Sequence, residues 1–233
     1  MKDTLLEYML NRYTERPNAP SAKVEPGPVI TLSRETGCGA AEIAEALVHR
    51  LNALPEQGTV KEKWGWIDRQ ILEKSAEELH LDPSQINKVF SDRERGTVDQ
   101  IVEALSGHYH KSDSKIRKTL QEVIRQFAEK GYVVIVGRGG ATVSHDIKRS
   151  LHIRLEAPLE WRIEAFARKY TSSLDFSRKF IIRRDIERDE FNNRVTGEKT
   201  LNLLYDCVIN RSRFTVDEIV ELVFRMASFK GIY

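Results

Sequence analysis

The chain has 233 residues, and its 37 Lys and Arg residues nearly cancel its 35 Asp and Glu residues, which leaves a net charge of +2. This length allows one sizeable hydrophobic core, and the balanced charge argues against a protein that binds nucleic acid through a generally basic surface. No apolar stretch is long enough to cross a bilayer or resembles a secretory signal. The two cysteines, Cys38 and Cys207, cannot form a zinc site by themselves. We therefore expect a cytoplasmic protein that does not associate with membranes.

The first 16 residues predict a helix with one apolar face, made of Leu5, Leu6, Met9, Leu10 and Tyr13. A segment rich in Pro, Ala, Ser and Gly, residues 17–28, ends this helix. We predict an N-terminal helical arm and linker at residues 1–27 and one α/β domain at residues 28–233. Because the opposite face of the arm is mixed in charge rather than basic, we expect the arm to pack on the domain or on a second copy of the chain, forming a homo-oligomer, rather than on a membrane.

A strand, a glycine turn and a helix are predicted between residues 28 and 52. Val29–Leu32 is a short apolar run, Gly37 and Gly39 lie in the polar turn, and the helix shows apolar residues at helical spacing. Glycines let backbone N–H groups surround an anion, and a helix N-terminus adds partial positive charge, so this turn suits a phosphate group. The alternative is an ordinary connection between a strand and a helix.

The turn departs from the phosphate-loop pattern G-x-x-x-x-G-K-[ST]. Gly39 can serve as the second glycine, but Arg34 stands at the first glycine position, and Ala40 and Ala41 replace the lysine and the hydroxyl residue. Phosphoryl chemistry here needs another cation, and Arg34 is the cation within the stretch that could supply it. Cys38 is either a thiol activated by the helix N-terminus or, in the simpler interpretation, a small residue that fills the loop.

Two further strands are predicted in the middle of the chain. Trp64–Asp68 is a short apolar run that ends in an acid, and Tyr132–Gly137 is typical of a central parallel strand that is buried on both faces. Helices are predicted between them at residues 69–79, 83–90, 98–105 and 114–130. Because ligands of open α/β sheets bind at the carboxyl ends of strands, Arg138 is expected at the same edge as the glycine turn.

The last part of the chain completes the alternation of strands and helices. Residues 151–157 and 205–210 are predicted strands, and residues 159–169 and 216–226 are predicted helices, with Pro158 in the first helical turn. This alternation predicts a doubly wound sheet of five parallel strands with helices on both faces.

A basic stretch lies between the fourth and fifth strands. On a helix, Arg184 and Arg188 would share one face, with Asp185 and Asp189 one step round. In one interpretation this is a solvated face laced with ion pairs at i,i+3 and i,i+4. In the other it is a charged excursion that folds over bound phosphates.

Five segments, in this order, resemble the cytidylate kinase-like proteins, relatives of bacterial cytidylate kinase: PVITLSRETGCGAAEIAEAL, GWIDRQIL, GYVVIVGRGG, LHIRLEAPLEWRIE and YDCVINRSRFTVDEIVELV. The resemblance covers residues 28–229. It implies the P-loop nucleoside-monophosphate kinase fold, with a helical flap after the second strand and a lid at about residues 171–200. It also implies transfer of the γ-phosphoryl group of ATP, with Mg²⁺, to CMP or a related monophosphate.

The resemblance assigns roles to residues. On the donor side the backbone of Thr36, Gly37, Cys38 and Gly39 would hold the phosphates, together with Arg34. On the acceptor side we place Asp68, Arg138 and Asp189, and the lid arginines that surround the transferring group match Arg184, Arg188 and Arg194. No side chains are assigned to hold a metal.

Some positions depart from the family pattern. Gly139 stands where cytidylate kinase has an aspartate, and the lid segment RDIERDEFNNR is longer than the kinase pattern RDxRDxNR. With Ala40 and Ala41 in the phosphate loop, two functions follow: a nucleoside-monophosphate kinase, or a nucleotide-sensing module that keeps the fold without turnover.

Overall fold

The computed structural model describes residues 26–54, 62–68, 113–196 and 204–233. Its centre is one sheet of five parallel strands in the order β2-β3-β1-β4-β5. The strands are β1 (Val29–Arg34), β2 (Gly65–Ile67), β3 (Val133–Val136), β4 (Ser150–Glu156) and β5 (Cys207–Asn210). The predicted doubly wound parallel sheet is therefore confirmed.

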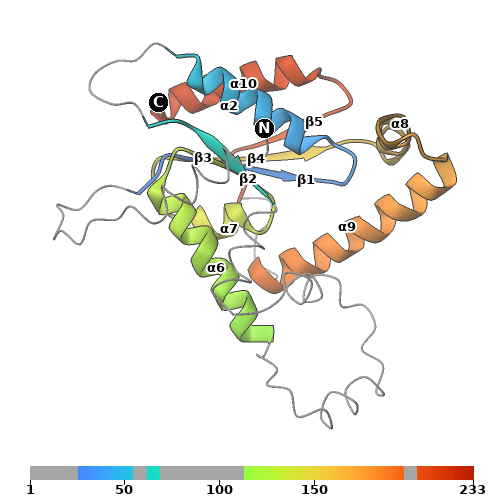
Figure 1. The fold of residues 1–233 in the computed structure, drawn as a ribbon, viewed down its shortest axis with the longest axis horizontal. Coiled ribbons are helices and arrows are strands. Elements are labelled where there is room, and N and C mark those ends of the chain that lie inside the picture. The colour runs from blue at the N-terminus through green and yellow to red at the C-terminus, as the bar shows by residue number, and fades with distance from the viewer. Residues whose placement is uncertain (1–25, 55–61, 69–112, 197–203) are drawn as a thin grey trace, which may run out of the picture.

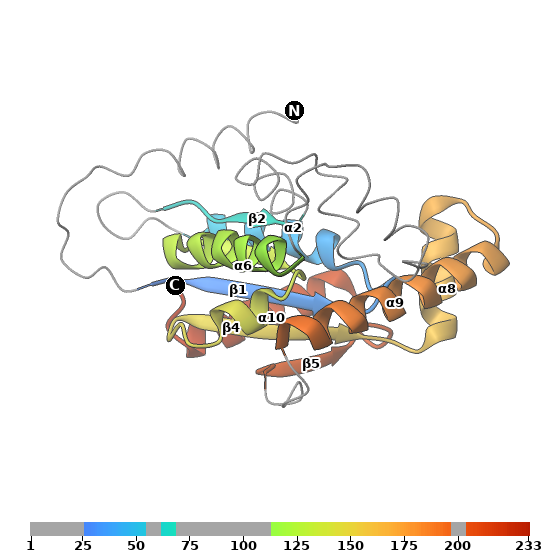
Figure 2. The ribbon, with the colours of Figure 1, turned by 90° about the horizontal axis from the view of Figure 1, so that it is seen from below.

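Helices cover both faces of this sheet (Figure 1). On one face lie α2 (Ala40–Asn52) and α10 (Val216–Phe229), and on the other lie α6 (Asp113–Lys130) and α7 (Gly140–Ser144). The helices α8 (Leu159–Tyr170) and α9 (Leu174–Thr196) follow β4 and pack on each other beyond its carboxyl end (Figure 2). Among the described helices, none has the length and apolar character needed to cross a membrane.

The core forms where apolar strands meet the apolar faces of helices. The β1 side chains of Val29, Ile30 and Leu32 are completely buried, and all four residues of β3 are buried. This matches the expectation for central strands covered on both faces. On α2, Ile43, Leu47 and other residues at helical spacing are buried against the same core. Burial of this face fixes the direction in which α2 leaves the glycine turn.

Strand order explains why the loops after three strands meet. β1 is bonded to β3 on one side and to β4 on the other, and β3 is bonded to β2. β1 and β2 are consecutive strands in the chain but are not neighbours in the sheet, because β3 lies between them. Parallel strands end at one edge, so the residues after β1, β2 and β3 are brought together there, where ligands of such sheets bind.

Several boundaries differ from the predictions. Arg34 is the last residue of β1 rather than part of the turn. Pro158 is the N-cap of α8, with ψ at 138°, rather than a residue of its first turn, because this extended backbone precedes the helix. The short helix α7 was not predicted, and α10 runs three residues further, to Phe229. The predicted arm and the helices at 69–79, 83–90 and 98–105 lie outside the described residues, and the division into domains stays a prediction.

Candidate functional site

The turn between β1 and α2 has the backbone conformation that its glycines suggested. Gly37 has a φ of 96°, and a Cβ atom there would lie 3.0 Å from the Cβ atom and the carbonyl oxygen of Arg162. Gly39 has a φ of 71° and is the N-cap of α2, with no side-chain hydrogen bond to the helix. The first turn of α2 thus begins without a side-chain cap, which leaves its N–H groups suited to an external anion.

Two N–H groups of the turn already have partners within the protein. The Thr36 N–H donates to Oδ1 of Asp185 at 2.8 Å, and the Cys38 N–H donates to the carbonyl oxygen of Glu35 at 3.3 Å. The Cys38 side chain is in the core, where burial and the nearby Glu35 carboxylate raise the pKa of its thiol to about 12. Cys38 therefore fills the loop and is not an activated nucleophile.

Arg34 lies over Gly137, at the end of the neighbouring strand β3. A Cβ atom at Gly137 would come within 1.5 Å of Nη1 of Arg34, so only glycine leaves room for this guanidinium. Arg34 Nη2 lies 3.4 Å from Oδ2 of Asp68, the residue that follows β2. Burial lowers the pKa of Arg34, and the Asp68 carboxylate opposes this shift. The guanidinium is a partly buried cation with one distant carboxylate, which is an arrangement that an anion would stabilise.

Arg138, in the turn after β3, joins the same group. Its Nε lies 3.6 Å from Oδ1 of Asp68, and its backbone has a φ of 57°, the left-handed region that side chains other than glycine rarely adopt. Burial lowers the pKa of Arg138, and the Arg188 and Arg184 guanidinium groups lower it further. Asp68 thus lies between Arg34, the last residue of β1, and Arg138, in the turn after β3. Arg138 lies at the same edge as the glycine turn, as predicted.

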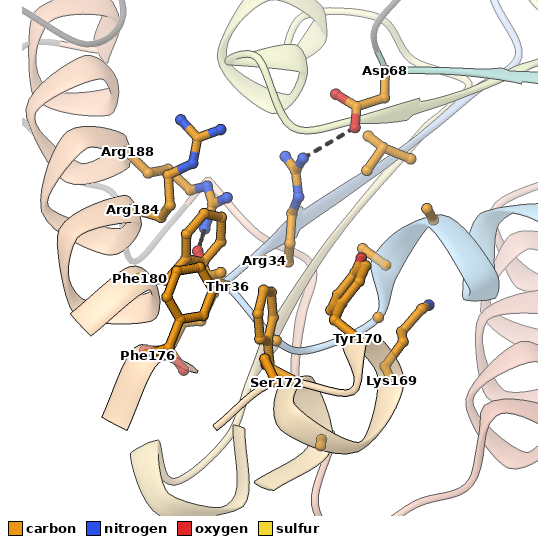
Figure 3. Close-up of a pocket in the computed structure, with 18 residues that line it drawn as sticks. Arg34, Thr36, Asp68, Lys169, Tyr170, Ser172, Phe176, Phe180, Arg184 and Arg188 are labelled. Carbon is orange, nitrogen blue, oxygen red and sulfur yellow. Dashed lines mark hydrogen bonds and ion pairs between the residues drawn. The ribbon is translucent and has the colours of Figure 1, made fainter. Parts of the chain in front are cut away.

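The helix α9 brings a second pair of arginines to the turn (Figure 3). Arg188 Nη1 donates to Thr36 Oγ1 at 2.9 Å and to Oδ1 of Asp185 at 3.2 Å. Burial and the Arg34 charge lower the pKa of Arg188 to about 10. Arg184 also lines the cavity but is more exposed, and its Nη1 donates to Oε2 of Glu187 at 3.0 Å.

A buried arginine that the sequence did not single out connects these parts. Arg162 of α8 is 8% exposed and donates to the Thr36 carbonyl oxygen at 3.1 Å, to the Ala157 carbonyl oxygen at 2.9 Å and to Asp185. Its Nε also lies 3.3 Å from Oε2 of Glu35. Arg162 and Asp185 together connect α9 to the glycine turn between β1 and α2. We call these two residues and Thr36 the lid bridge.

Arg34, Arg184 and Arg188 line a cavity of about 570 Å³ between the turn, α8 and α9. Gly37, Gly39, Ala40 and Ala41 line one side, and Arg34, Asp68, Arg184 and Arg188 line another. The remaining wall is aromatic, formed by Phe166, Tyr170, Phe176 and Phe180. Figure 3 shows the guanidinium groups and the rings facing the same space. The sequence analysis missed this wall. Its signal would have been two pairs of aromatic residues, each with a spacing of four residues, on either side of a polar turn.

Other predicted site residues fall outside this constellation. Asp189 is exposed and does not line the cavity. Arg194 belongs to α9, but its side chain lies outside what the structure describes. The ion pairs expected on α9 are present, although Arg184 pairs with Glu187 rather than with Asp185 or Asp189.

The described residues do not fit a protein-held Mg²⁺ ion. They contain no group of three or more His, Cys, Asp or Glu residues that could hold a metal. The Asp68 carboxylate is engaged by Arg34 and Arg138, Thr36 Oγ1 accepts from Arg188, and Ala41 offers no hydroxyl. Mg²⁺ needs oxygen ligands, and here they would have to come from phosphates and water.

Comparison with known proteins gives the family and supports the fold. An uncharacterized protein from Eubacterium ventriosum has a similar structure, with a TM-score of 0.59, 15% identity and coverage of 86% of this chain and 97% of that one. A shikimate kinase from Bacteroides thetaiotaomicron matches with a TM-score of 0.46, 14% identity and coverage of 86% and 98%. A gluconokinase from Sinorhizobium meliloti matches with a TM-score of 0.46, 11% identity and coverage of 87% and 92%. No curated protein matches the sequence significantly. The sequence pattern of the cytidylate kinase-like family matches residues 29–213, most of the chain, and the chain therefore belongs to the cytidylate kinase-like family.

Proposed function

We propose that this protein is a nucleoside-monophosphate kinase that transfers the γ-phosphoryl group of ATP to CMP or a related monophosphate. One observation carries the proposal: Arg34 of β1, Arg184 and Arg188 of α9, and Arg138 in the turn after β3 gather beside a glycine turn whose helix has no side-chain cap. Phosphoryl transfer needs little covalent help from a protein, because catalysis comes from positioning the reactants and neutralising charge.

The reaction assigns each group a task. An oxygen of the acceptor phosphate attacks the γ-phosphorus, the bond from the γ-phosphorus to the bridging oxygen breaks, and ADP leaves with the electron pair of that bond. Gly37, Gly39 and the first turn of α2 would hold the donor phosphates, with Arg34 and Arg188 replacing the missing lysine. Both guanidinium groups have pKa values lowered by burial, so bound phosphates would relieve an unfavourable environment.

The acceptor would lie on the side of β2 and β3. Arg138 is held there by its left-handed backbone and by Asp68. A planar guanidinium can bind two phosphate oxygens at once, so Arg138 suits the acceptor phosphate. Arg184, which is the more exposed of the two α9 arginines at the cavity, would meet the charge that develops on the transferring group.

A nucleotide-sensing module without turnover is the second candidate, and a specific contact favours it. Asp185 accepts a hydrogen bond from the Thr36 N–H, so a carboxylate of the protein occupies a donor predicted to hold phosphate. The two alanines in the first turn of α2 point the same way, because they supply neither the usual cation nor the usual hydroxyl.

A coupled assay distinguishes the two candidates. ADP release is measured with ATP and Mg²⁺ and each of CMP, dCMP, UMP, AMP and GMP, beside calorimetric titrations of the same nucleotides. Acceptor-dependent ADP release supports the kinase. Tight nucleotide binding without acceptor-dependent turnover supports the sensor, and the absence of any nucleotide binding would overturn both.

A further inference from the structure

The aromatic side of the cavity is a continuous cluster contributed by two helices. We call Phe166 and Tyr170 of α8 and Phe176 and Phe180 of α9 the aromatic wall. The ring centroid of Phe166 lies 4.5 Å from that of Tyr170 and 5.0 Å from that of Phe180. Phe176 stacks on Phe180, with 6.0 Å between the ring centroids. The rings therefore form one surface across the turn between α8 and α9.

This cluster is not an ordinary piece of core. Tyr170 is 60% exposed and Phe176 is 56% exposed, although both line the cavity. Large aromatic side chains left open to water beside a cavity indicate a binding surface when they gather rather than occur singly. The Arg184 guanidinium lies 5.6 Å from the centre of the Phe180 ring, so the aromatic wall meets the arginine cluster directly.

We propose that the aromatic wall stacks the base of the nucleotide whose phosphates bind at the glycine turn, and that it does so with little preference among bases. This inference rests on the proposed binding of a nucleotide at that turn. A nucleotide joins a planar ring to a chain of anions, and the cavity offers an aromatic surface joined to a cluster of cations. The volume of about 570 Å³ lies within the range of cavities that hold such ligands.

The polar groups beside the aromatic wall explain why recognition would be tolerant. Ser172 Oγ shares a hydrogen bond with Ser177 Oγ at 2.9 Å, and Lys169 Nζ lies 3.5 Å from the Glu42 carboxylate. Ser172 and Lys169 both line the cavity, and each already has a partner within the protein. A wall of this kind recognises the face of a ring rather than the hydrogen-bonding edge that distinguishes the bases, and stacking of this sort accepts any base.

The test compares nucleotides with a ligand that has no base. Calorimetry gives the affinities of ATP, GTP, CTP, UTP and inorganic tripolyphosphate for the wild type, Tyr170→Ala, Phe176→Ala and Phe229→Ala. Phe229 ends α10, is 87% exposed and does not line the cavity, so its variant is the matched control. All three side chains are exposed, and thermal melts of each variant verify that it folds.

The expected result has three parts. The four nucleoside triphosphates bind the wild type within about tenfold of one another, and more tightly than tripolyphosphate. Tyr170→Ala or Phe176→Ala weakens each nucleoside triphosphate by about 5- to 150-fold, the loss found for single stacking residues, and leaves tripolyphosphate unchanged. Phe229→Ala changes neither.

Three other outcomes would each contradict a different part of the proposal. If tripolyphosphate binds as tightly as ATP and Phe176→Ala leaves ATP unaffected, the base does not use the aromatic wall, while the phosphate site stands. If one base is preferred by more than a hundredfold, the wall is not tolerant. If neither ATP nor tripolyphosphate binds the wild type, the proposed function fails and this inference fails with it.

Discussion

Replacing Gly137 with alanine should displace Arg34 and thereby weaken nucleotide binding. The new Cβ atom would lie 1.5 Å from Nη1 and 2.7 Å from Cζ of Arg34, so the guanidinium must leave its place beside Asp68. Losing a charge-assisted contact with phosphate costs about 1–3 kcal/mol, which corresponds to about a 5- to 150-fold weaker affinity. The measurement is a calorimetric titration with ATP.

The same substitution also strains the backbone, and a control must separate the two effects. Gly137 has a φ of 71°, where alanine costs about 1–2 kcal/mol. Gly231 has a φ of 60°, and a Cβ atom there would meet nothing within 4 Å. Gly231→Ala therefore carries the backbone cost alone, and for a chain of this size each 1 kcal/mol lowers Tm by about 2–4 °C.

The comparison of the two variants decides the outcome. Gly231→Ala should lower Tm by a few degrees and bind ATP as the wild type does, whereas Gly137→Ala should lower Tm at least as much and lose affinity. If both variants melt alike and both bind ATP with wild-type affinity, the position of Arg34 over Gly137 has no part in nucleotide binding, and the assignment of Arg34 as the replacement cation is wrong.

Three further predictions follow from the same site and from the core. Arg184→Ala should lower kcat by about 10³-fold or more if Arg184 contacts the transferring phosphoryl group. Arg183→Ala removes the other partner of Glu187 and should leave kcat nearly unchanged. Equal kcat values for the two variants in steady-state assays would exclude this role of Arg184. Arg138→Lys keeps the charge but not the planar fork, so it should raise the acceptor KM and spare ATP affinity; equal losses for both nucleotides would mark Arg138 as structural. Burial lowers the pKa of His152 to about 4, below its unfolded value near 6.5, so the unfolded chain binds more protons than the folded protein. The free energy of unfolding should therefore fall by up to about 3 kcal/mol as the pH drops from 6.5 to 4. In urea unfolding across this range the wild type should lose stability more steeply than His152→Gln, and parallel curves would contradict this prediction.

Local patterns predicted the elements that position the site. Each of the five strands lies within two residues of its predicted bounds, because short apolar runs next to turn residues are local signals. The placement of Arg138 at the same edge as the glycine turn followed from the general rule for parallel sheets. The order of the strands was not predicted, since periodicity carries no information about which strands are neighbours.

The contacts that organise the cavity are long-range, and this is why they were missed. Arg162 reaches Thr36 across 126 residues, and Asp185 reaches the same residue across 149. The sequence shows Asp185 only as one of several acids on a charged helix. It does not show whether Asp185 pairs with an arginine of the same helix or with a residue far away in the chain. Gly137 was predicted as the last residue of a buried strand, whereas the structure shows that it leaves room for a side chain from another strand.

The lid bridge has a consequence for how α9 responds to its surroundings. Among residues 174–189 of α9, whose side chains the structure describes, Ile181 is the one fully buried apolar side chain. With so little apolar burial, the charged contacts of the lid bridge fix the position of α9 relative to the glycine turn, and salt screens them only weakly because Arg162 and Asp185 are 8% and 21% exposed. Asp185 behaves as an internal anionic ligand of Thr36, Arg162 and Arg188. A triphosphate entering the cavity would have to compete with this carboxylate for Thr36 and Arg188, so nucleotide binding would be coupled to the attachment of α9 to the turn.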